Sequence, residues 1–269
     1  MKYLVIDAEG MVGQVVSLWL KEALHEVHDI CTPTYNSLDI IAKEIISNSY
    51  DAVINCAAIV NKYAEKDKSG ASFINAFLPH YLEELTADTK TVIVHRSTDC
   101  VFSGSRGQYG LNDIPDAPSF YARTKAIGEL LNDKDITIRT SLIGPEIEEG
   151  GEGLFNWFYH QTETCGFANA IWTGLTTIEF AKEIDKLVQG RSHGVFQLVP
   201  DAAISKYDLL QLFEEYYPGN RVIKKVDNKR VDKSLIPVKP DDLIIPNYKI
   251  QIQEMRRWTD KHIDIYRYR

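Results

Sequence analysis

The sequence predicts an α/β protein whose core is a doubly wound parallel sheet. Three observations predict it. Short β-branched runs alternate with amphipathic helical segments through the first half of the chain, a glycine-containing turn follows the first apolar run, and several apolar runs end in small or polar residues. Alternating strands and helices form parallel sheets covered by helices on both faces. Ligands bind such sheets outside the carboxyl ends of their strands.

The amino terminus supplies the first strand, turn and helix. An apolar run at 2–6 precedes Asp7, Gly10 and Gly13, and apolar residues recur at helical spacing across 15–20. This layout is typical of a turn that binds the pyrophosphate of a dinucleotide at the start of a helix. Gly10 would let a cofactor approach the backbone, and Gly13 would let the helix pack closely on the sheet. Asp7 stands where a glycine normally forms the tight turn, so an ordinary strand–helix turn without a ligand is the alternative.

The remaining elements of the first half alternate in the same way. Apolar, β-branched runs predict strands at 50–58, 89–95 and 135–141. Amphipathic spacing predicts helices at 38–49, 72–85 and 122–131. The strand at 50–58 runs into Ala57 and Ala58, small residues that allow a flat ring or a ribose to lie against the backbone.

Three residues carry the chemical prediction. Tyr121 and Lys125 lie four apart, so on a helix they share a face. A free phenol titrates near pH 10, and a neighbouring ammonium would favour the phenolate and lower that pKa. Thr98 follows the strand at 89–95 and would bring a hydroxyl to the same oxygen atom of a substrate. The alternatives are an exposed helix face without a chemical role and, for Ser97 and Thr98, ordinary strand-end turn residues; for Ser97 we favour the turn.

These motifs occur in the order seen in extended short-chain dehydrogenases. The stretch Ser-Thr-Asp-x-Val-Phe-x-Gly at 97–104, followed by YxxxK at 121–125, most closely resembles dTDP-4-dehydrorhamnose reductase and related nucleotide-sugar reductases. The resemblance covers residues 1–145 well. It implies a Rossmann-like dinucleotide-binding domain at 1–145 and a smaller, mainly substrate-binding lobe at 146–269, in which 170–200 returns to the core domain.

The resemblance also implies a role for each matching residue. Tyr121 would be the proton donor, Lys125 its cationic partner, and Thr98 the hydroxyl that holds the sugar carbonyl. The cofactor-binding residues would be Gly10, Met11, Val12, Gly13, Asp39, Ile40, Ala57, Ala58, Asn75, Tyr121 and Lys125. Asn75 would organise the site from a helix; a polar residue on a half-exposed helix is its alternative. Leu142 departs from the pattern, because the rhamnose enzymes usually carry a sugar-contacting tryptophan there.

The activity implied is the NAD(P)H-dependent reduction of a keto group on a nucleotide-linked deoxy sugar, in the synthesis of polysaccharide precursors. NADPH is preferred over NADH because it suits a biosynthetic reduction, although no clear Arg or Asp after 27–30 decides between them. The alternative is a non-catalytic regulatory or scaffold protein that keeps the fold and binds the cofactor. Asp7 favours this alternative, whereas the presence of Thr98, Tyr121 and Lys125 favours the enzyme.

The amino-acid composition limits the classes of function that this chain can have. A net charge of −8 argues against a general nucleic-acid binder, which needs basic phosphate contacts. The four cysteines have no CxxC spacing and lie in apolar surroundings, which suggests reduced core thiols in a cytoplasmic protein. No metal cluster, signal peptide or membrane span is expected. The expected partner is a nucleotide-sugar substrate, and a homodimer is allowed.

The carboxyl half should select the substrate. Residues 145–153 are acidic and rich in glycine, which is typical of a mobile loop. An aromatic helix at 154–159 could pack over a base or a sugar, but aromatic residues at helical spacing more often cover a core. The basic residues considered for an anionic diphosphate are Lys224, Lys225, Lys229 and Arg230. A charged, solvated surface explains them equally well.

Overall fold

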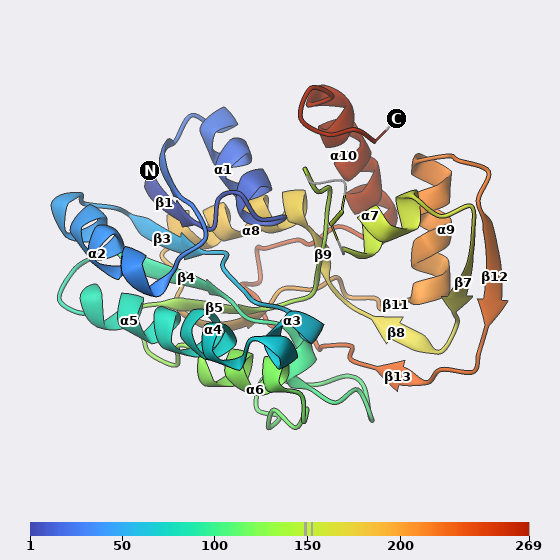
Figure 1. Cartoon of the computed structure of the whole chain (residues 1–269), viewed down its shortest axis with the longest axis horizontal. Coiled ribbons are helices and arrows are strands. Elements are labelled where there is room, and N and C mark those ends of the chain that lie inside the picture. The colour runs from blue at the N-terminus through green and yellow to red at the C-terminus, as the bar shows by residue number, and fades with distance from the viewer. Residues whose placement is uncertain (148–149, 152, 269) are drawn as a thin grey trace. The chain divides into compact units, whose positions relative to one another are not determined.

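The computed structural model describes residues 1–147, 150–151 and 153–268. The loop predicted at 145–153 therefore lies partly outside the described residues. The chain divides into two compact units, which are described separately (Figure 1). The first comprises Met1–Ser103, Ile114–Arg139 and Ala181–Phe196, and the second comprises Gly104–Asp113, Thr140–Phe180 and Gln197–Arg269.

The first unit contains a six-stranded sheet with the order β10-β5-β4-β3-β1-β2. Its strands are β1 (Lys2–Ile6), β2 (Glu26–Ile30), β3 (Ala52–Asn55), β4 (Val92–Arg96), β5 (Ile136–Arg139) and β10 (Gly194–Gln197). β1 pairs in parallel with both β2 and β3, β3 with β4, and β4 with β5. The chain thus winds in one direction from β1 to β2 and in the other from β3 to β5. The predicted doubly wound α/β fold is confirmed.

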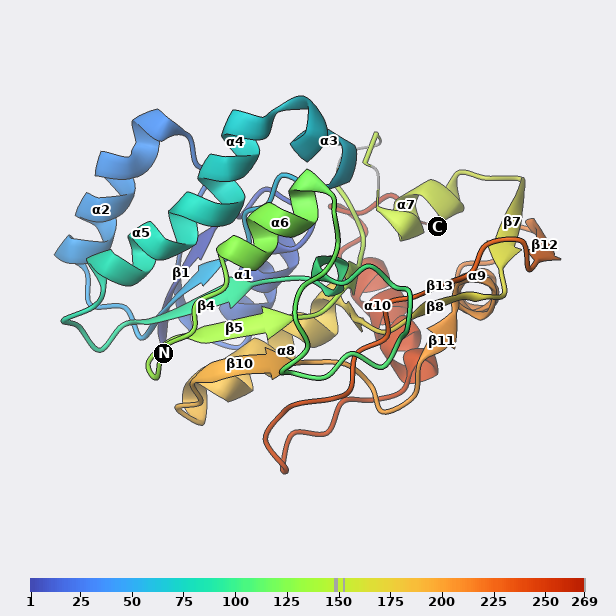
Figure 2. The ribbon, with the colours of Figure 1, turned by 90° about the horizontal axis from the view of Figure 1, so that it is seen from below.

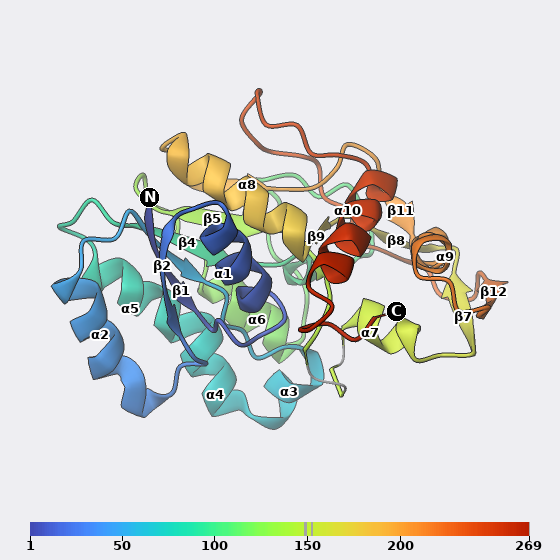
Figure 3. The same ribbon diagram turned by 90° about the horizontal axis from the view of Figure 1, so that it is seen from above.

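Helices cover both faces of this sheet (Figures 2 and 3). α1 (Gly13–Glu22) and the part of α8 (Thr177–Gln189) that belongs to the first unit lie on one face. α2 (Leu38–Ser47), α5 (Leu78–Leu85) and α6 (Phe120–Ile127) lie on the other. Short helical pieces complete the unit: 3-10 turns at Tyr35–Ser37 and Asp99–Val101, α3 (Asn61–Lys66), α4 (Lys68–Ser72) and a π-helical segment at Phe73–Phe77.

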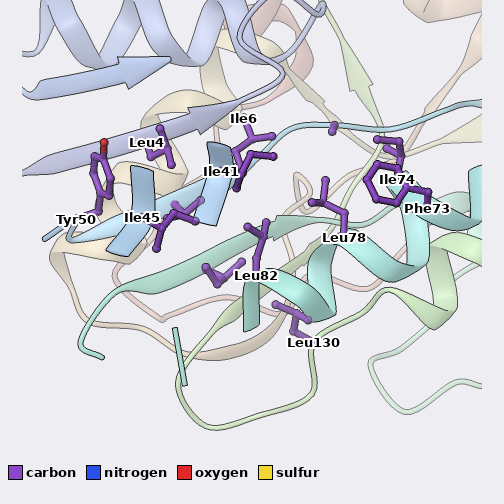
Figure 4. Close-up of a cluster of buried hydrophobic side chains, with 13 residues drawn as sticks. Leu4, Ile6, Ile41, Ile45, Tyr50, Phe73, Ile74, Leu78, Leu82 and Leu130 are labelled. Atoms are coloured by element: carbon purple, nitrogen blue, oxygen red, sulfur yellow. The ribbon is translucent and has the colours of Figure 1, made fainter. Parts of the chain in front are cut away.

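Strands buried on both faces explain this arrangement. All four residues of β3 and all four of β5 are buried, as expected for parallel strands between two helical layers. Alternate residues of β1 point to opposite faces. Leu4 and Ile6 join a cluster with residues of α2 and α5 (Figure 4), whereas the Tyr3 hydroxyl donates a hydrogen bond to Asp185 of α8 at 2.5 Å.

Two predicted helices differ from the observed ones. The helix expected at 72–85 is divided into the end of α4, the π-helical segment and α5. The helix expected at 122–131 begins earlier, at Phe120, because the Ser119 side chain caps it by accepting a hydrogen bond from Ala122 N–H at 3.2 Å. It ends at Ile127, before Gly128.

The second unit consists of small sheets and three helices within the part of the chain that is described. Its strands are β6 (Leu142–Ile143), β7 (Glu163–Phe167), β8 (Ala170–Trp172), β9 (Leu175–Thr176), β11 (Ile204–Ser205), β12 (Val222–Val226) and β13 (Val231–Asp232). Its helices are α7 (Leu154–Tyr159), α9 (Lys206–Tyr216) and α10 (Tyr248–Lys261). Phe155 of α7 is fully buried against the rings of Phe213, Tyr217 and Tyr268. Helix α7 therefore covers a core, as aromatic residues at helical spacing more often do.

Candidate functional site

The candidate site lies where the winding direction of the first sheet reverses. β1 is paired with β2 on one side and with β3 on the other, and ligands of doubly wound sheets bind at this point, outside the carboxyl ends of the strands. Asp7 directly follows β1, Ala57 and Ala58 follow β3, and Thr98 follows β4. The sheet therefore brings these predicted residues to one edge.

Close packing fixes the turn after β1. Asp7 has a φ of 65°, in the left-handed region that a glycine would adopt without strain. A Cβ atom on Gly13 would lie 2.0 Å from the Asp7 carbonyl oxygen, so α1 rests directly on the turn. A Cβ atom on Gly10 would lie 2.5 Å from Asp7 Oδ2. Gly13 is therefore required by contact with the Asp7 backbone, whereas Gly10 makes room for the Asp7 carboxylate.

The start of α1 suits an anion. In the described structure no side chain caps this helix at Val12, and the amino-terminal N–H groups of a helix attract negative charge. Met11 is half-buried and Val12 is 4% exposed, so the loop backbone is ordered by packing. These residues fit the pyrophosphate of a dinucleotide.

Two carboxylates from this loop contact the segment after β2. The Thr32 hydroxyl donates a hydrogen bond to Asp7 Oδ1 at 2.6 Å, and the Cys31 thiol donates to Glu9 Oε1 at 3.2 Å. Burial raises the pKa of Asp7, although the Thr32 hydrogen bond and the Arg96 guanidinium act in the opposite direction. Asp7 is thus turned toward the end of β2.

Thr98 is held at the carboxyl end of β4. It precedes a 3-10 turn and its hydroxyl accepts a hydrogen bond from Cys100 N–H at 3.1 Å. The same hydroxyl donates to Asp99 Oδ1 at 3.2 Å and acts to lower the pKa of the Tyr121 phenol. Ser97 has another role: its hydroxyl donates at 2.6 Å to Glu129, which forms a buried ion pair with Arg139.

Tyr121 is 7% exposed and packs against Ala64 and Ala71. Burial raises its pKa to about 12. We expected the Lys125 ammonium to lower this pKa. The expected direction is wrong, because desolvation of the phenolate outweighs the Arg96 guanidinium and the Thr98 hydroxyl, which act in the opposite direction. A raised pKa keeps Tyr121 protonated at neutral pH, which is the state a proton donor needs.

Lys125 is 1% exposed. Its Nζ donates a hydrogen bond to the Arg96 carbonyl oxygen at 2.6 Å and lies 3.3 Å from His95 Nε2. Burial, followed by the positive charge of Arg96, holds the pKa of Lys125 well below its ordinary value. His95 is fully buried and lies 3.3 Å from the Asn55 amide through Nδ1.

Sequence reasoning missed Arg96 and His95. The Arg96 guanidinium donates to the Cys56 carbonyl oxygen at 3.1 Å, and it acts electrostatically on Asp7, Tyr121 and Lys125. Its buried Nε has no partner among the residues described. A histidine and an arginine that end an apolar strand immediately before the Ser-Thr-Asp motif were the available signal.

Asn75 joins two parts of the site. Its side chain accepts a hydrogen bond from Ile59 N–H at 3.0 Å, and it donates to the Ile59 carbonyl at 2.8 Å and to Thr124 Oγ1 at 3.2 Å. Asn75 is fully buried, so the half-exposed alternative is wrong. It connects the segment after Ala57 and Ala58 with the helix that carries Tyr121. Its place in a π-helical segment is typical of functional positions.

Other predicted residues lie elsewhere. Asp39 and Ile40 are in the first turn of α2, where Asp39 is exposed and Ile40 is 66% exposed. Within the described structure they do not join the hydrogen-bonded group around Tyr121. In the second unit, Lys224 pairs with Glu163, whereas Arg230 lines a cavity of about 420 Å³ together with Arg106.

The family model of the RmlD substrate binding domain matches residues 1–147. The chain belongs to this family. The match contains the glycine turn, Thr98, Tyr121 and Lys125. The resemblance to nucleotide-sugar reductases that these motifs predicted is therefore confirmed.

Curated relatives of this RmlD-family chain include reductases of dTDP-linked sugars. It is 28% identical over 230 residues to dTDP-4-keto-6-deoxy-D-glucose reductase of Streptomyces niveus, a match covering 78% of this chain and 77% of that protein. It is 35% identical over 135 residues to dTDP-4-dehydrorhamnose reductase of Mycobacterium tuberculosis, covering 47% of this chain and 44% of that enzyme. The latter match thus spans less than half of its relative.

Solved structures share the fold of this RmlD-family chain. A hypothetical dTDP-4-dehydrorhamnose reductase from Sulfolobus tokodaii has a TM-score of 0.77 and 25% identity, over 92% of this chain and 98% of that one. A dTDP-4-dehydrorhamnose reductase from Bacillus anthracis, solved with NADP, has a TM-score of 0.83 at 19% identity, over 96% of this chain and 99% of that one. At that identity the likeness shows the fold.

Two further kinds of site have no candidate among the described residues. No helix among them combines the length and the apolar character needed to cross a membrane. The same residues contain no group of three or more His, Cys, Asp or Glu side chains that could hold a metal ion. Of the four free cysteines, Cys56 is buried, Cys100 is half-buried, and Cys31 and Cys165 are exposed. The expectation of four core thiols is therefore wrong.

Proposed function

We propose that this chain reduces a keto group on a nucleotide-linked deoxy sugar with a reduced nicotinamide dinucleotide. The observation that carries the proposal is the placement of the buried Tyr121 phenol near the buried Thr98 hydroxyl. Both lie in the unit whose glycine turn fits a pyrophosphate. Membership of the RmlD family and the reductases among its relatives support the reaction class.

Each polar group has one task in this reaction. The bound cofactor supplies the hydride to the carbonyl carbon. Tyr121 donates its phenol proton to the developing alkoxide, and the Thr98 hydroxyl donates a hydrogen bond to the same oxygen, so that charge is stabilised as it forms. Lys125 lies one helical turn from Tyr121 and would relay to the phenolate a proton taken up from solvent, which restores the phenol. Asn75 positions Tyr121 by tying α6 to the segment after β3.

The same proposal assigns the cofactor-binding residues. The backbone from Gly10 to Gly13 holds the pyrophosphate at the start of α1, and Ala57 and Ala58 form the wall beside a ribose. Asp39 and Ile40 remain proposed neighbours of the adenine. Residues 1–145 act as the dinucleotide domain, and 146–269 mainly bind the substrate, with 170–200 returning to the core domain.

The experiment that tests this function is cofactor oxidation across a panel of nucleotide-linked keto sugars, including dTDP-4-keto-6-deoxy sugars. We expect oxidation that depends on the sugar nucleotide. Cofactor binding without oxidation of any member, together with a stable complex with another protein from cell extract, would favour the non-catalytic scaffold. The carboxylate of Asp7 in the glycine turn is the one observation that favours that second candidate.

Two further proposals concern the location of the protein in the cell and its oligomeric state. We place the reaction in the cytoplasm, where the four free cysteines would stay reduced. We also propose that the chain acts with a second copy of itself as a homodimer. Fractionation of the native cells and light scattering of the purified protein test these two points.

A further inference from the structure

We propose that Asp7 and Glu9 select a dinucleotide whose adenosine ribose carries a free 2′-hydroxyl, so that this chain binds NADH in preference to NADPH. The inference rests on the proposed function, and it concerns one end of the same cofactor site. It reverses the preference for NADPH that analogy with biosynthetic reductions gives.

The segment that normally reads the adenosine ribose carries no charge in this chain. In dinucleotide-binding sheets, an acidic residue at the end of the second strand binds the ribose 2′-hydroxyl, or a nearby arginine accommodates the 2′-phosphate. Here β2 ends at Ile30, and residues 30–37 contain no Asp, Glu, Lys or Arg. The acid nearest this end of β2, Asp29, is bonded to Ser17 and Lys21 of α1. A residue that binds the ribose hydroxyl is therefore expected from another element, and residues 30–37 contain no cation that can accept a 2′-phosphate.

The turn after β1 brings the carboxylates of Asp7 and Glu9 to the end of β2. Asp7 is bonded to Thr32, and Glu9 is bonded to Cys31, so both acids are tied to the two residues that follow β2. Asp7 has a left-handed backbone, and its carboxylate lies over Gly10, which has no Cβ atom to displace it. Its Oδ1 accepts the Thr32 hydroxyl, and within the described structure its Oδ2 accepts no hydrogen bond from the protein. That oxygen can accept a bond from a ribose hydroxyl.

The charge balance at this position opposes a phosphate. Two carboxylates repel the added negative charge of a 2′-phosphate, whereas an uncharged hydroxyl can donate to them. Arg96 is a cation that acts on Asp7. Its guanidinium is bonded to the Cys56 carbonyl after β3, and β3 lies on the opposite side of β1 from β2. The guanidinium of Arg96 is therefore bonded on the β3 side of β1, away from the end of β2.

The same geometry explains why Asp7 need not abolish cofactor binding. A carboxylate directed at the pyrophosphate would repel NADH and NADPH alike. Because the carboxylates of Asp7 and Glu9 are held at the end of β2, their repulsion acts on the part of the cofactor in which the two dinucleotides differ. The departure from glycine at position 7 thus becomes a determinant of specificity.

Equilibrium binding tests the inference without requiring turnover. Calorimetric titration of the full chain with NADH, NADPH, ADP-ribose and its 2′-phosphate would compare the wild type with Asp7→Asn, Glu9→Gln and the double variant. Glu84→Gln is the matched control, because it removes one negative charge from an exposed position on α5. Circular dichroism establishes that each variant is folded, and Glu9→Gln, at an exposed position, keeps the test available if Asp7→Asn does not fold.

We expect wild type to bind NADH at least about tenfold more tightly than NADPH, with a larger ratio at low salt, because screening weakens repulsion between charges. The double variant should bring the ratio close to one, mainly by tightening NADPH, and Glu84→Gln should leave it unchanged. Equal or tighter binding of NADPH by wild type, or a ratio that the double variant does not change, would overturn the inference while leaving the proposed function intact. Binding of neither dinucleotide would overturn both.

Discussion

At the scale of single residues, burial dominates the chemistry of the candidate site. Tyr121 and Lys125 are both almost fully buried. Desolvation favours the neutral form of each side chain, so it raises the pKa of Tyr121 and lowers the pKa of Lys125. Their spacing in the sequence predicted a shared helix face. It could not predict this shift, because the burial comes from Ala64 and Ala71, which belong to other helices.

Lys125→Met should raise the stability of the folded protein at neutral pH while it lowers turnover. The folded state holds the pKa of Lys125 well below its ordinary value. At this lysine the unfolded chain therefore binds a proton more readily than the folded protein does. This difference lowers the free energy of unfolding at pH values below the ordinary lysine pKa. Replacing a poorly compensated buried amine by an apolar chain should gain about 1 kcal/mol.

The gain should shrink as the pH rises toward the ordinary lysine pKa, near 10.4, since the amine is then neutral in both states. Urea unfolding of both proteins at several pH values measures it. A lower stability of Lys125→Met at pH 7 would show that the hydrogen bond to Arg96 outweighs the desolvation of the amine.

At the scale of elements, the turn between β1 and α1 was the most accurately predicted feature. Two glycines three residues apart, between an apolar run and an apolar helix, predicted the turn and the close approach of Gly13. The division of the predicted helix at 72–85 was not predictable in the same way. A π-helical segment there places Asn75 between Ile59 and Thr124, and neither of these partners is local in sequence.

Gly13→Ala should destabilise the chain by about 1–3 kcal/mol, the usual cost of overpacking. The added methyl group would meet the Asp7 backbone, which cannot move aside as a flexible side chain does. Gly150→Ala is the control, because a Cβ atom there meets nothing within 4 Å. Thermal unfolding followed by circular dichroism compares the two variants. Equal melting temperatures for Gly13→Ala and wild type would contradict the packing described for this turn.

At the scale of the whole molecule, the first unit depends on a distant piece of the chain. Residues 181–196 contribute most of α8 and the edge strand β10. Asp185 Oδ1 accepts a hydrogen bond from the Tyr3 hydroxyl at 2.5 Å and lies 3.2 Å from His25 Nε2. The resemblance to known reductases implied that 170–200 returns to the core domain, but the pairing of Tyr3 with Asp185 joins residues that no local pattern connects.

The segment 1–147, which the family model matches, should therefore not fold as the full chain does. Without α8 and β10, β5 becomes an exposed edge strand and the apolar face under α8 is uncovered, both of which promote aggregation. Expression of residues 1–147 beside the full chain, followed by size-exclusion chromatography, tests this expectation. A monomeric segment with a cooperative unfolding transition would show that residues 181–196 are dispensable.

The central claim is that Tyr121 donates the proton in the reduction of a nucleotide-linked keto sugar. It is tested most directly by the rate of cofactor oxidation with a dTDP-4-keto-6-deoxy sugar, measured for wild type and Tyr121→Phe, with cofactor affinity measured alongside. Loss of the general acid should lower kcat by about 10²–10⁴-fold while leaving the affinity for the cofactor and the fold unchanged, because only the hydroxyl is removed. Undiminished turnover by Tyr121→Phe would contradict the account.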